Sequence, residues 1–186
     1  MALQAESQGV LESAGVPVLF TGVGKINAAH VLTRKLAEYR FDGRPAPHVV
    51  NFGTAGSRTY RTGALVACRS FVQRDIDVTA LGFERGVTPF DPVPGVIEFP
   101  PTFAGLPQGT CSTGDSFETT GNPVVGDVLD MEAYALAKVC RLENTRFSCV
   151  KFVTDGADHT AAADWQANLS SAAAEFLRIY RSLVGQ

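Results

Sequence analysis

The sequence lacks the features by which membrane, secreted and nucleic-acid-binding proteins are recognised. None of its apolar runs approaches the roughly 20 residues that a membrane-spanning helix needs. The first residues, MALQAESQGV, contain no basic stretch followed by an apolar one, so they do not read as a signal peptide. The net charge of -3 argues against binding to nucleic-acid phosphates, because such surfaces are normally basic. We therefore expect a cytoplasmic protein with neither a membrane nor a nucleic acid as partner.

Cysteine is scarce, and the 4 cysteines never form a C-x-x-C motif. They lie at positions 68, 111, 140 and 149, mostly inside apolar runs such as LVACRSF and FSCVKF. This distribution is typical of buried free thiols in a reducing compartment rather than of disulfides or a zinc site. The sequence also contains no HExxH motif, no phosphate-binding P-loop and no cluster of metal ligands. We expect no metal and no cofactor.

Apolar residues make up 45% of the 186 residues, which is enough for one globular domain with a sizeable core. Segments of helical and of strand-like character alternate along the chain. We expect helices at 2–14, 25–39, 132–142 and 161–183, strands at VPVLF, 48–52, 64–72 and 147–153, shorter extended segments at 109–112 and 124–131, and a proline-rich loop over most of 74–108. Several strands are apolar throughout, which is typical of a largely parallel sheet covered on both faces. The prediction is a single α/β domain spanning residues 1–186.

Three of the expected strands end in loops rich in glycine, threonine or aspartate. VPVLF leads into TGVGK, HVVNF leads into GTAGS, and VKFV leads into TDGADH. In open α/β sheets, ligands bind outside the carboxyl ends of the strands. We therefore expect the functional site where these three loops meet.

The glycine-rich loops are weak motifs when each is considered alone. TGVGKINAAH lacks the third glycine of a dinucleotide-binding fingerprint, and the next strand carries no acidic residue for a ribose, so that fingerprint fails. Gly22 and Gly24 could let the backbone approach a ligand or could simply form a tight turn, and both interpretations stay open. GTAGS could hold a phosphate or pack against a nucleoside. Arg58 and Arg61 follow it and could bind an anion, although such arginines are more often solvated.

Two pairs of carboxylates lie beside expected helices. In DMEAYALA, Asp130 and Glu132 stand at a strand-to-helix junction, where a carboxylate could favour the helix N-terminus or could accept hydrogen bonds from both hydroxyls of a ribose. In TDGADH, Asp158 is suited to capping the next helix, whereas Asp155 sits closer to the strand end. A carboxyl group among apolar neighbours has a raised pKa and can serve as a general acid. Asp155 is therefore the candidate catalytic acid, and His159 receives no role.

Six motifs occur along the chain in a distinctive order: GVGKINAA, NFGTAGS, RDIDVTALGFERG, STGDSF, DMEAYALA and VTDGAD. Their order and approximate spacing resemble those of the 5′-methylthioadenosine/S-adenosylhomocysteine nucleosidases, a family of the nucleoside phosphorylase superfamily. Each motif is modest, but the set covers nearly the whole chain. The resemblance implies a three-layer α/β/α sandwich around a mixed, mostly parallel twisted sheet. It also implies hydrolysis of the N-glycosidic bond of adenine-type nucleosides such as 5′-methylthioadenosine or S-adenosylhomocysteine, with release of adenine.

The same resemblance implies roles for individual residues. Asp155, preceded by Thr154, would be the general acid at purine N7, and Glu6 would position or activate the attacking water. Glu132 would hold the ribose hydroxyls, with Met131 beneath the sugar. The remaining substrate-binding residues would be Phe117 against the purine face, the backbone around Glu118 at the purine edge, and Thr54, Ala55 and Gly56 near the ribose and the water.

The resemblance also implies a homodimer. In the family, the segment that corresponds to DVTALGF reaches into the site of a neighbouring subunit. Val78, Leu81 and Pro89 would then line the 5′-substituent pocket of that subunit. The alternative is a hydrophobic loop that packs on its own domain.

The sequence departs from the family at its start and after Phe117. The family has a β-strand that ends just before the residue matched by Glu6, whereas here Met1 falls at that point. Either the start is truncated or the sheet lacks its first strand, and a missing strand would leave Glu6 poorly anchored and turnover weak. The stretch from Phe117 to Asp130 is also short, which predicts a more open base pocket. Two alternatives therefore stay open: a purine nucleoside phosphorylase that uses phosphate, and a catalytically weak nucleoside-binding protein.

Overall fold

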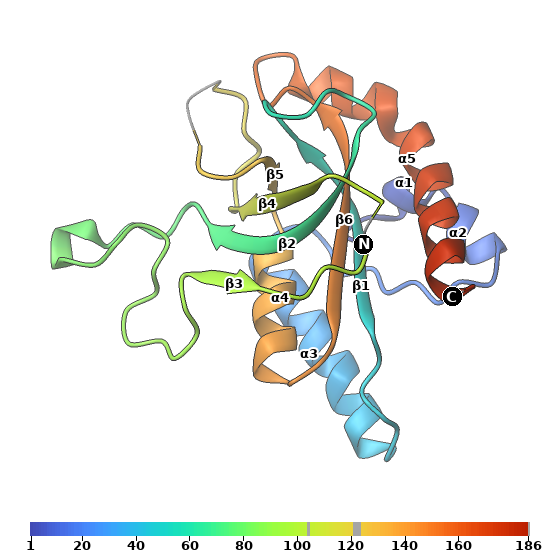
Figure 1. The fold of residues 1–186 in the computed structure, drawn as a ribbon, viewed down its shortest axis with the longest axis horizontal. Helices are drawn as coiled ribbons and strands as arrows, with labels where there is room; N and C mark the ends of the chain where they lie inside the picture. Colours follow the sequence, from blue (N-terminus) through green and yellow to red (C-terminus); the bar gives the residue numbers. More distant parts are fainter. Residues whose placement is uncertain (104, 121–123, 186) are drawn as a thin grey trace.

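The computed structural model describes residues 1–103, 105–120 and 124–185 and shows an α/β fold (Figure 1). Its strands are β1 (Val49–Gly56), β2 (Leu65–Gln73), β3 (Val96–Glu98), β4 (Gln108–Thr113), β5 (Val128–Asp130) and β6 (Phe147–Asp155). Its helices are α1 (Gln4–Ser7), α2 (Val10–Ser13), α3 (Lys25–Phe41), α4 (Ala133–Leu142) and α5 (Ala161–Val184), with one 3₁₀ turn, η1 (Thr79–Leu81).

The strands form one mixed sheet in the order β3-β2-β4-β5-β1-β6. Because β2 also pairs with β6, the sheet curls into a closed, barrel-like shape. β2 makes both pairings along its length: residues 65–68 run antiparallel to β6, whereas residues 67–73 run parallel to β4.

The directions of the strands bear on the expectation of a mixed, mostly parallel sheet. In the described part of the chain, the parallel pairs are β1–β6, β2–β4 and β4–β5, and the antiparallel pairs are β1–β5, β2–β3 and β2–β6. The α/β class and the mixed sheet are confirmed. The expectation of a mostly parallel sheet agrees with the two longest pairings, β1–β6 and β2–β4, which are both parallel, whereas the antiparallel pairings are short.

Helices pack against both faces of the sheet because successive strand residues point to opposite sides. In β6, Val150 and Phe152 join a core with Phe176 of α5, whereas Cys149 and Val153 join a second core with α3 and α4. Figure 1 shows α5, α1 and α2 together beside β1 and β6, and α3 next to α4. Every residue of β6 is buried, which explains why this strand is apolar over most of its length.

The long helices expected from the sequence are confirmed. α3 and α5 extend slightly past their expected ends, and α4 begins at Ala133 after its N-cap residue Glu132. α3 buries Leu32 and Leu36 against the core, whereas Ile26 in its first turn is 81% exposed. No described helix has the length and apolar character needed to cross a membrane. The four cysteines are all buried and free of disulfide bonds, as expected.

The two predictions for the start of the chain, a helix over 2–14 and a strand at VPVLF, are wrong. Residues 2–14 form α1 and α2 instead of one helix, because Gln8 and Gly9 adopt left-handed backbone conformations with φ of 47° and 73°. Such residues interrupt a right-handed helix. The segment VPVLF is not a strand, because it pairs with no strand of the described chain: its Val16 N donates to Leu11 O at 3.0 Å, and its Leu19 O accepts from Met1 N at 3.1 Å.

Two further expectations concern the loops and the first strand. In the described residues, no strand precedes β1. Apart from η1 and β3, residues 74–103 form no helix or strand, which agrees with the expected long loop. The expectation for the short stretch between Phe117 and Asp130 falls partly on residues 121–123, which lie outside the described residues.

Candidate active site

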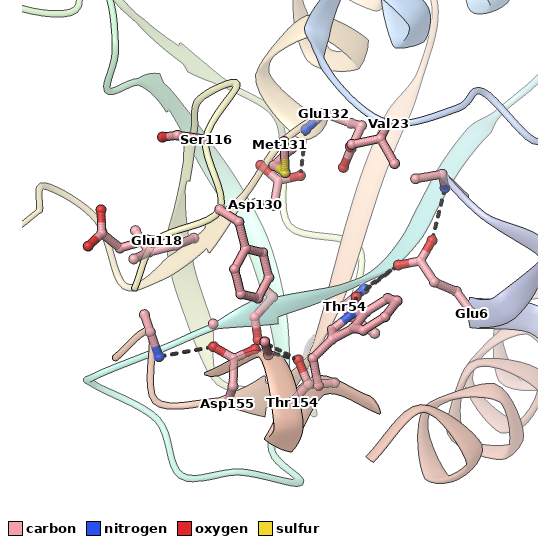
Figure 2. Close-up of a pocket in the computed structure, with 18 of the residues that line it drawn as sticks. Glu6, Val23, Thr54, Ser116, Glu118, Asp130, Met131, Glu132, Thr154 and Asp155 are labelled. Carbon is pink, nitrogen blue, oxygen red and sulfur yellow. Dashed lines mark hydrogen bonds between the residues drawn. The ribbon is translucent and has the colours of Figure 1, made fainter. Parts of the chain in front are cut away.

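A cavity of about 610 Å³ lies at the carboxyl ends of β1, β5 and β6 (Figure 2). α1, the start of α5 and the loop after β4 complete its wall. Every residue predicted for catalysis or substrate binding lines this cavity: Glu6, Thr54, Ala55, Gly56, Phe117, Glu118, Met131, Glu132, Thr154 and Asp155. The position of the cavity agrees with the expectation that the site lies where strand-end loops meet.

Asp155 is the last residue of β6 and lines the cavity while only 2% exposed. Its Oδ2 accepts a hydrogen bond from the Thr154 hydroxyl at 2.8 Å, and its Oδ1 accepts one from the Ala157 backbone N–H at 2.9 Å. β1 passes so close that residue 56 must be glycine, since a Cβ on Gly56 would lie 2.6 Å from Asp155 Oδ1.

Burial raises the pKa of Asp155, because an ionised carboxylate loses its hydration among apolar neighbours. The hydrogen bonds from Thr154 and Ala157 lower the pKa of Asp155, but the effect of burial is larger, so the pKa stays raised. The carboxyl group therefore keeps its proton to a higher pH than an exposed aspartate does. This property suits a group that donates a proton.

Glu132 lies on the side of the cavity away from Asp155 in Figure 2. Its Oε1 accepts the backbone N–H of Gly24 at 2.9 Å. Burial, together with the negative charge of Asp130, raises the pKa of Glu132 to about 7. Gly22 and Gly24 have φ of 78° and 93°, so the loop is the tight turn that one interpretation of the glycines required.

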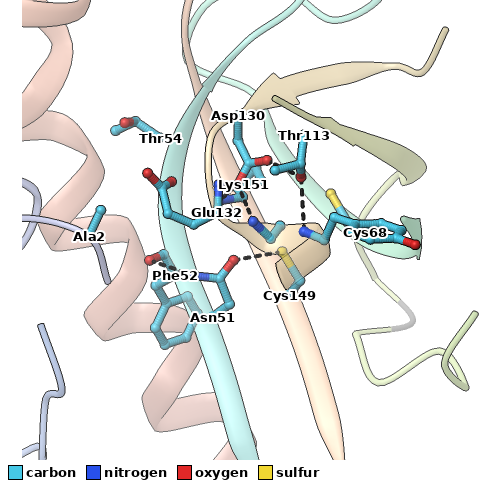
Figure 3. A network of polar contacts seen from close by, with 12 residues as sticks. Ala2, Asn51, Phe52, Thr54, Cys68, Thr113, Asp130, Glu132, Cys149 and Lys151 are labelled. Carbon is cyan, nitrogen blue, oxygen red and sulfur yellow. Dashed lines mark hydrogen bonds and ion pairs between the residues drawn. The ribbon is translucent and has the colours of Figure 1, made fainter. Parts of the chain in front are cut away.

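A buried ion pair supports the turn that carries Glu132 (Figure 3). Lys151 Nζ lies 2.8 Å from Asp130 Oδ2, and the two side chains are 2% and 1% exposed. Asp130 also accepts the Thr113 hydroxyl at 2.5 Å and the Ala133 N–H at 2.7 Å, so it holds the start of α4. Burial alone would raise the pKa of Asp130, but the Lys151 ammonium and these hydrogen bonds hold it below its usual range.

Glu6 is held by four hydrogen bonds and is 4% exposed. Its Oε2 accepts the N–H groups of Ala2 and Leu3 at 3.0 and 3.1 Å. Its Oε1 accepts the Thr54 N–H at 2.8 Å and the Thr54 hydroxyl at 3.0 Å. The expectation that Glu6 would be poorly anchored is therefore wrong, because the chain around α1 and the end of β1 fix both carboxylate oxygens.

The loop after β4 brings an aromatic ring to the cavity. Phe117 lines the cavity and is 46% exposed, so its ring is open to stack against a flat ligand. Glu118 lies 3.5 Å from Arg58, and Arg58 donates to the Ala157 carbonyl at 2.7 Å. Arg58 thus ties this loop to the turn after Asp155. Neither Arg58 nor Arg61 lines the cavity, which disfavours the anion-binding interpretation of these arginines.

Some sequence predictions fall outside the cavity. Val78, Leu81 and Pro89 do not line it, and Leu81 is 73% exposed. Their role in a neighbouring subunit stays a prediction. Asp158 accepts the Thr160 N–H at 2.9 Å in the turn before α5, so its contact is structural, but the expectation that it caps α5 is wrong because the N-cap is Thr160.

Trp165 and Arg74 line the cavity, although neither of them received a functional role from the sequence. Trp165 lies near the start of α5, and its indole N–H donates to the Thr54 hydroxyl at 3.0 Å. Arg74 stands at the start of the RDIDVTALG motif, and its guanidinium reaches several backbone carbonyls beside the cavity. A lone tryptophan near the acidic TDGADH turn was a signal, but it could not be distinguished from a core residue. Among the described residues, no group of His, Cys, Asp and Glu side chains could hold a metal ion.

The chain is similar to known proteins in its sequence. The family model of the phosphorylase superfamily matches residues 116–185. A 5′-methylthioadenosine/S-adenosylhomocysteine nucleosidase from Bacillus pumilus is 30% identical over 89% of this chain and 78% of its own length.

Solved structures show the same fold. The Neisseria meningitidis 5′-methylthioadenosine/S-adenosylhomocysteine nucleosidase in complex with methylthio-immucillin-A superposes with a TM-score of 0.81 at 24% identity, covering 98% of this chain and 95% of that one. The futalosine hydrolase of Helicobacter pylori superposes with a TM-score of 0.84 at 19% identity, covering 99% and 94%. The extent and identity of the Bacillus match decide the assignment. The chain belongs to the family of 5′-methylthioadenosine/S-adenosylhomocysteine nucleosidases.

Proposed function

We propose that this protein hydrolyses the N-glycosidic bond of adenine-type nucleosides such as 5′-methylthioadenosine or S-adenosylhomocysteine and releases adenine. One observation carries the proposal: Asp155 and Glu132 line the same cavity, at the ends of different strands, with Glu6 on a third wall. A purine nucleoside has a base that needs a proton, a ribose with two hydroxyl donors and an anomeric carbon that a water must reach. The three carboxyl groups match these three needs.

Asp155 is the general acid of the proposed reaction. Proton donation to purine N7 lets adenine leave as a neutral molecule, and the raised pKa of Asp155 keeps that proton available. Phe117 stacks on the base, and the backbone near Glu118 reads its edge. As the glycosidic bond breaks, positive charge develops on the sugar, as in other glycoside hydrolysis. The nearby carboxylates stabilise this charge.

Glu132 and Glu6 act on the sugar and on the water. Glu132 accepts hydrogen bonds from the ribose hydroxyls, with Met131 beneath the ring. Glu6 positions the attacking water, and Thr54, Ala55 and Gly56 line the path between it and the ribose. Thr154 supports Asp155 through its hydroxyl group. The firm anchoring of Glu6 favours a working hydrolase over a protein that only binds nucleosides.

The charges around the cavity favour water over phosphate as the nucleophile. Among the described lining residues, the carboxylates are Glu6, Glu118, Asp130, Glu132 and Asp155, and the only lysine or arginine is Arg74. The two Nη atoms of Arg74 each donate to two backbone carbonyl oxygens, so their N–H groups already have acceptors within the protein. Among the described residues that line the cavity, an inorganic phosphate would therefore meet several carboxylates and no lysine or arginine whose terminal N–H groups are free.

The wider arrangement is also part of the proposal. Residues 1–186 act as one nucleoside phosphorylase-like domain, with the helices and sheet in three layers. Two copies form a homodimer in which Val78, Leu81 and Pro89 complete the partner's 5′-substituent pocket. The exposure of Leu81 and Phe90, 73% and 96%, supports an apolar contact on this loop. The buried free thiols fit a cytoplasmic setting.

Incubation of the purified protein with a panel of nucleosides tests the proposal. We expect release of adenine from 5′-methylthioadenosine at the same rate with and without added phosphate, together with free 5-methylthioribose. A sugar 1-phosphate that forms only with phosphate would identify a phosphorylase. Tight binding of the nucleoside with no adenine release over hours would identify a binding protein.

A further inference from the structure

Arg74 follows β2 and joins three segments of the cavity wall through backbone carbonyl groups. Its Nη1 donates to the carbonyl oxygens of Ser112 and Asp130, both at 2.8 Å. Its Nη2 donates to the carbonyl oxygens of Gly114, at 3.3 Å, and of Ser116. These acceptors belong to the end of β4, to the loop that follows β4 and to the end of β5. One side chain therefore fixes the distances between the three segments.

The surrounding backbone is shaped to receive this guanidinium. A Cβ on Gly114 would lie 2.9 Å from Arg74 Cζ and 3.0 Å from Nε, so glycine is required for the close approach. The Arg74 N–H donates to the Thr113 carbonyl at 2.9 Å, and the Gly114 N–H donates to the Asp130 carbonyl at 3.1 Å. Backbone hydrogen bonds and the hydrogen bonds of the Arg74 side chain thus both hold the loop after β4 against the end of β5.

The segments joined by Arg74 carry the residues that bind the substrate in the proposed function. Ser116 immediately precedes Phe117 and Glu118, and Asp130 immediately precedes Met131 and Glu132. Charge-assisted hydrogen bonds are stronger than neutral ones, and the planar fork of a guanidinium serves several acceptors at fixed angles. A lysine ammonium is a compact charge that cannot reproduce this arrangement.

We propose that Arg74 is a positioning residue that sets the spacing between the base-binding loop around Phe117 and the ribose-binding turn around Glu132. This inference rests on the proposed function of the cavity. Arg74 acts through backbone carbonyls and donates no proton to the substrate. Its loss loosens the base-binding loop, so it weakens binding of the purine more than it slows the chemical step.

Three variants test this role: Arg74→Met, Arg74→Lys and the control Arg69→Met, which removes an exposed arginine from β2, the strand that Arg74 follows. Adenine affinity is measured by calorimetry, KM and kcat by adenine release, and loop order by hydrogen exchange at the amides of residues 114–118. We expect Arg74→Met to weaken adenine binding and raise KM by about tenfold or more, which corresponds to about 1.4 kcal/mol. We expect kcat to change less than KM and exchange at these amides to become faster. Arg69→Met should match the unmodified protein in all three measurements.

Arg74→Lys keeps the charge and supplies the test if Arg74→Met does not fold. We expect it to resemble Arg74→Met, because an ammonium cannot serve the four carbonyls. The proposal is overturned if Arg74→Lys restores the KM and amide exchange of the unmodified protein, or if either variant lowers kcat alone. Failure of the proposed function would look different: the unmodified protein would release no adenine, while the effect of Arg74 on amide exchange would still be measurable.

Discussion

Trp165 donates its indole N–H to the Thr54 hydroxyl over 3.0 Å, and Thr54 donates its own hydroxyl hydrogen to Glu6 over the same distance. An indole N–H can only donate, and a carboxylate can only accept. The Thr54 hydroxyl, which has one hydrogen, must therefore point toward Glu6. Trp165 of α5 thus controls the orientation of a hydrogen bond at Glu6, the carboxylate that positions the water in the proposed reaction.

The first prediction concerns Trp165→Phe, which keeps an aromatic ring but removes the N–H donor. The freed Thr54 hydroxyl can rotate away from Glu6, so we expect kcat to fall by about three- to tenfold, in line with one neutral hydrogen bond. KM should change little if the ring still fills its place. Thr54→Ser keeps the hydroxyl and serves as the control, whereas Thr54→Val should show a similar loss of kcat. Equal rates for Trp165→Phe and the unmodified protein would exclude this role of the indole.

Asp155→Asn gives the second prediction. The amide has almost the same shape but cannot donate a proton to the base as a carboxylic acid does, so we expect adenine release to slow by about 10²- to 10⁴-fold. The matched control is Asp158→Asn, three residues further on, which keeps an oxygen for the Thr160 N–H and should retain activity. Thermal unfolding checks that both variants fold. A rate for Asp155→Asn close to that of the unmodified protein would refute the proton-donor role.

The third prediction concerns pH. The pKa of Glu132 is raised to about 7, so this carboxyl group loses its proton as the pH rises through neutrality. A carboxylate accepts hydrogen bonds from ribose better than the protonated acid does, so affinity for a nucleoside should increase from pH 6 to pH 8. We expect about a tenfold change, since one pH unit below a pKa leaves roughly a tenth of the group ionised.

Binding of adenine is the control that distinguishes the titration of Glu132 from that of Asp155. Adenine has no ribose, so in the proposed function it contacts only the base-binding side of the cavity and does not depend on Glu132. The pH profile of the ratio of nucleoside affinity to adenine affinity therefore reports on Glu132. In Glu132→Gln this ratio should no longer change with pH, since an amide does not titrate. A ratio that stays pH-dependent in Glu132→Gln would assign the effect to another group.

The fourth prediction concerns stability. Lys151→Met removes the ammonium that pairs with Asp130 and leaves a carboxylate buried without its partner. Breaking one partner of a buried ion pair typically costs about 3–5 kcal/mol, so the free energy of unfolding in urea should fall by that amount. Lys35→Met is the control, because Lys35 pairs with Glu38 on the exposed surface of α3 and should matter by less than about 1 kcal/mol. Similar stability losses in both variants would show that the Asp130 pair does not support the fold.

Several features of this protein could be predicted from residues that are close in the sequence. The apolar run before Thr154 and Asp155 is typical of a buried strand, and β6 is buried at every position. The periodic apolar residues before Tyr39 and after Ala161 predicted α3 and α5. These predictions succeeded because burial patterns and helix periodicity are local properties of a chain.

The failures came from contacts between distant segments. VPVLF has the composition of a strand, but a strand needs a neighbouring strand, and the backbone bonds of this segment go to Met1 and Leu11, which lie in no described strand. The antiparallel pairing of β2 with β6, which closes the sheet, left no signal in either strand. Trp165 and Arg74 were ambiguous for the same reason, because each makes its decisive hydrogen bonds far away in the sequence.

The sequence by itself determined the α/β class, the long helices and the order of motifs that identifies the family. Only the tertiary structure decided that Glu6 is firmly anchored, that Arg74 and Trp165 organise the cavity, and that the sheet closes on itself. The physical reason is that hydrophobic periodicity and glycine-rich turns act over a few residues, whereas hydrogen bonds and strand pairing depend on where the chain returns in space.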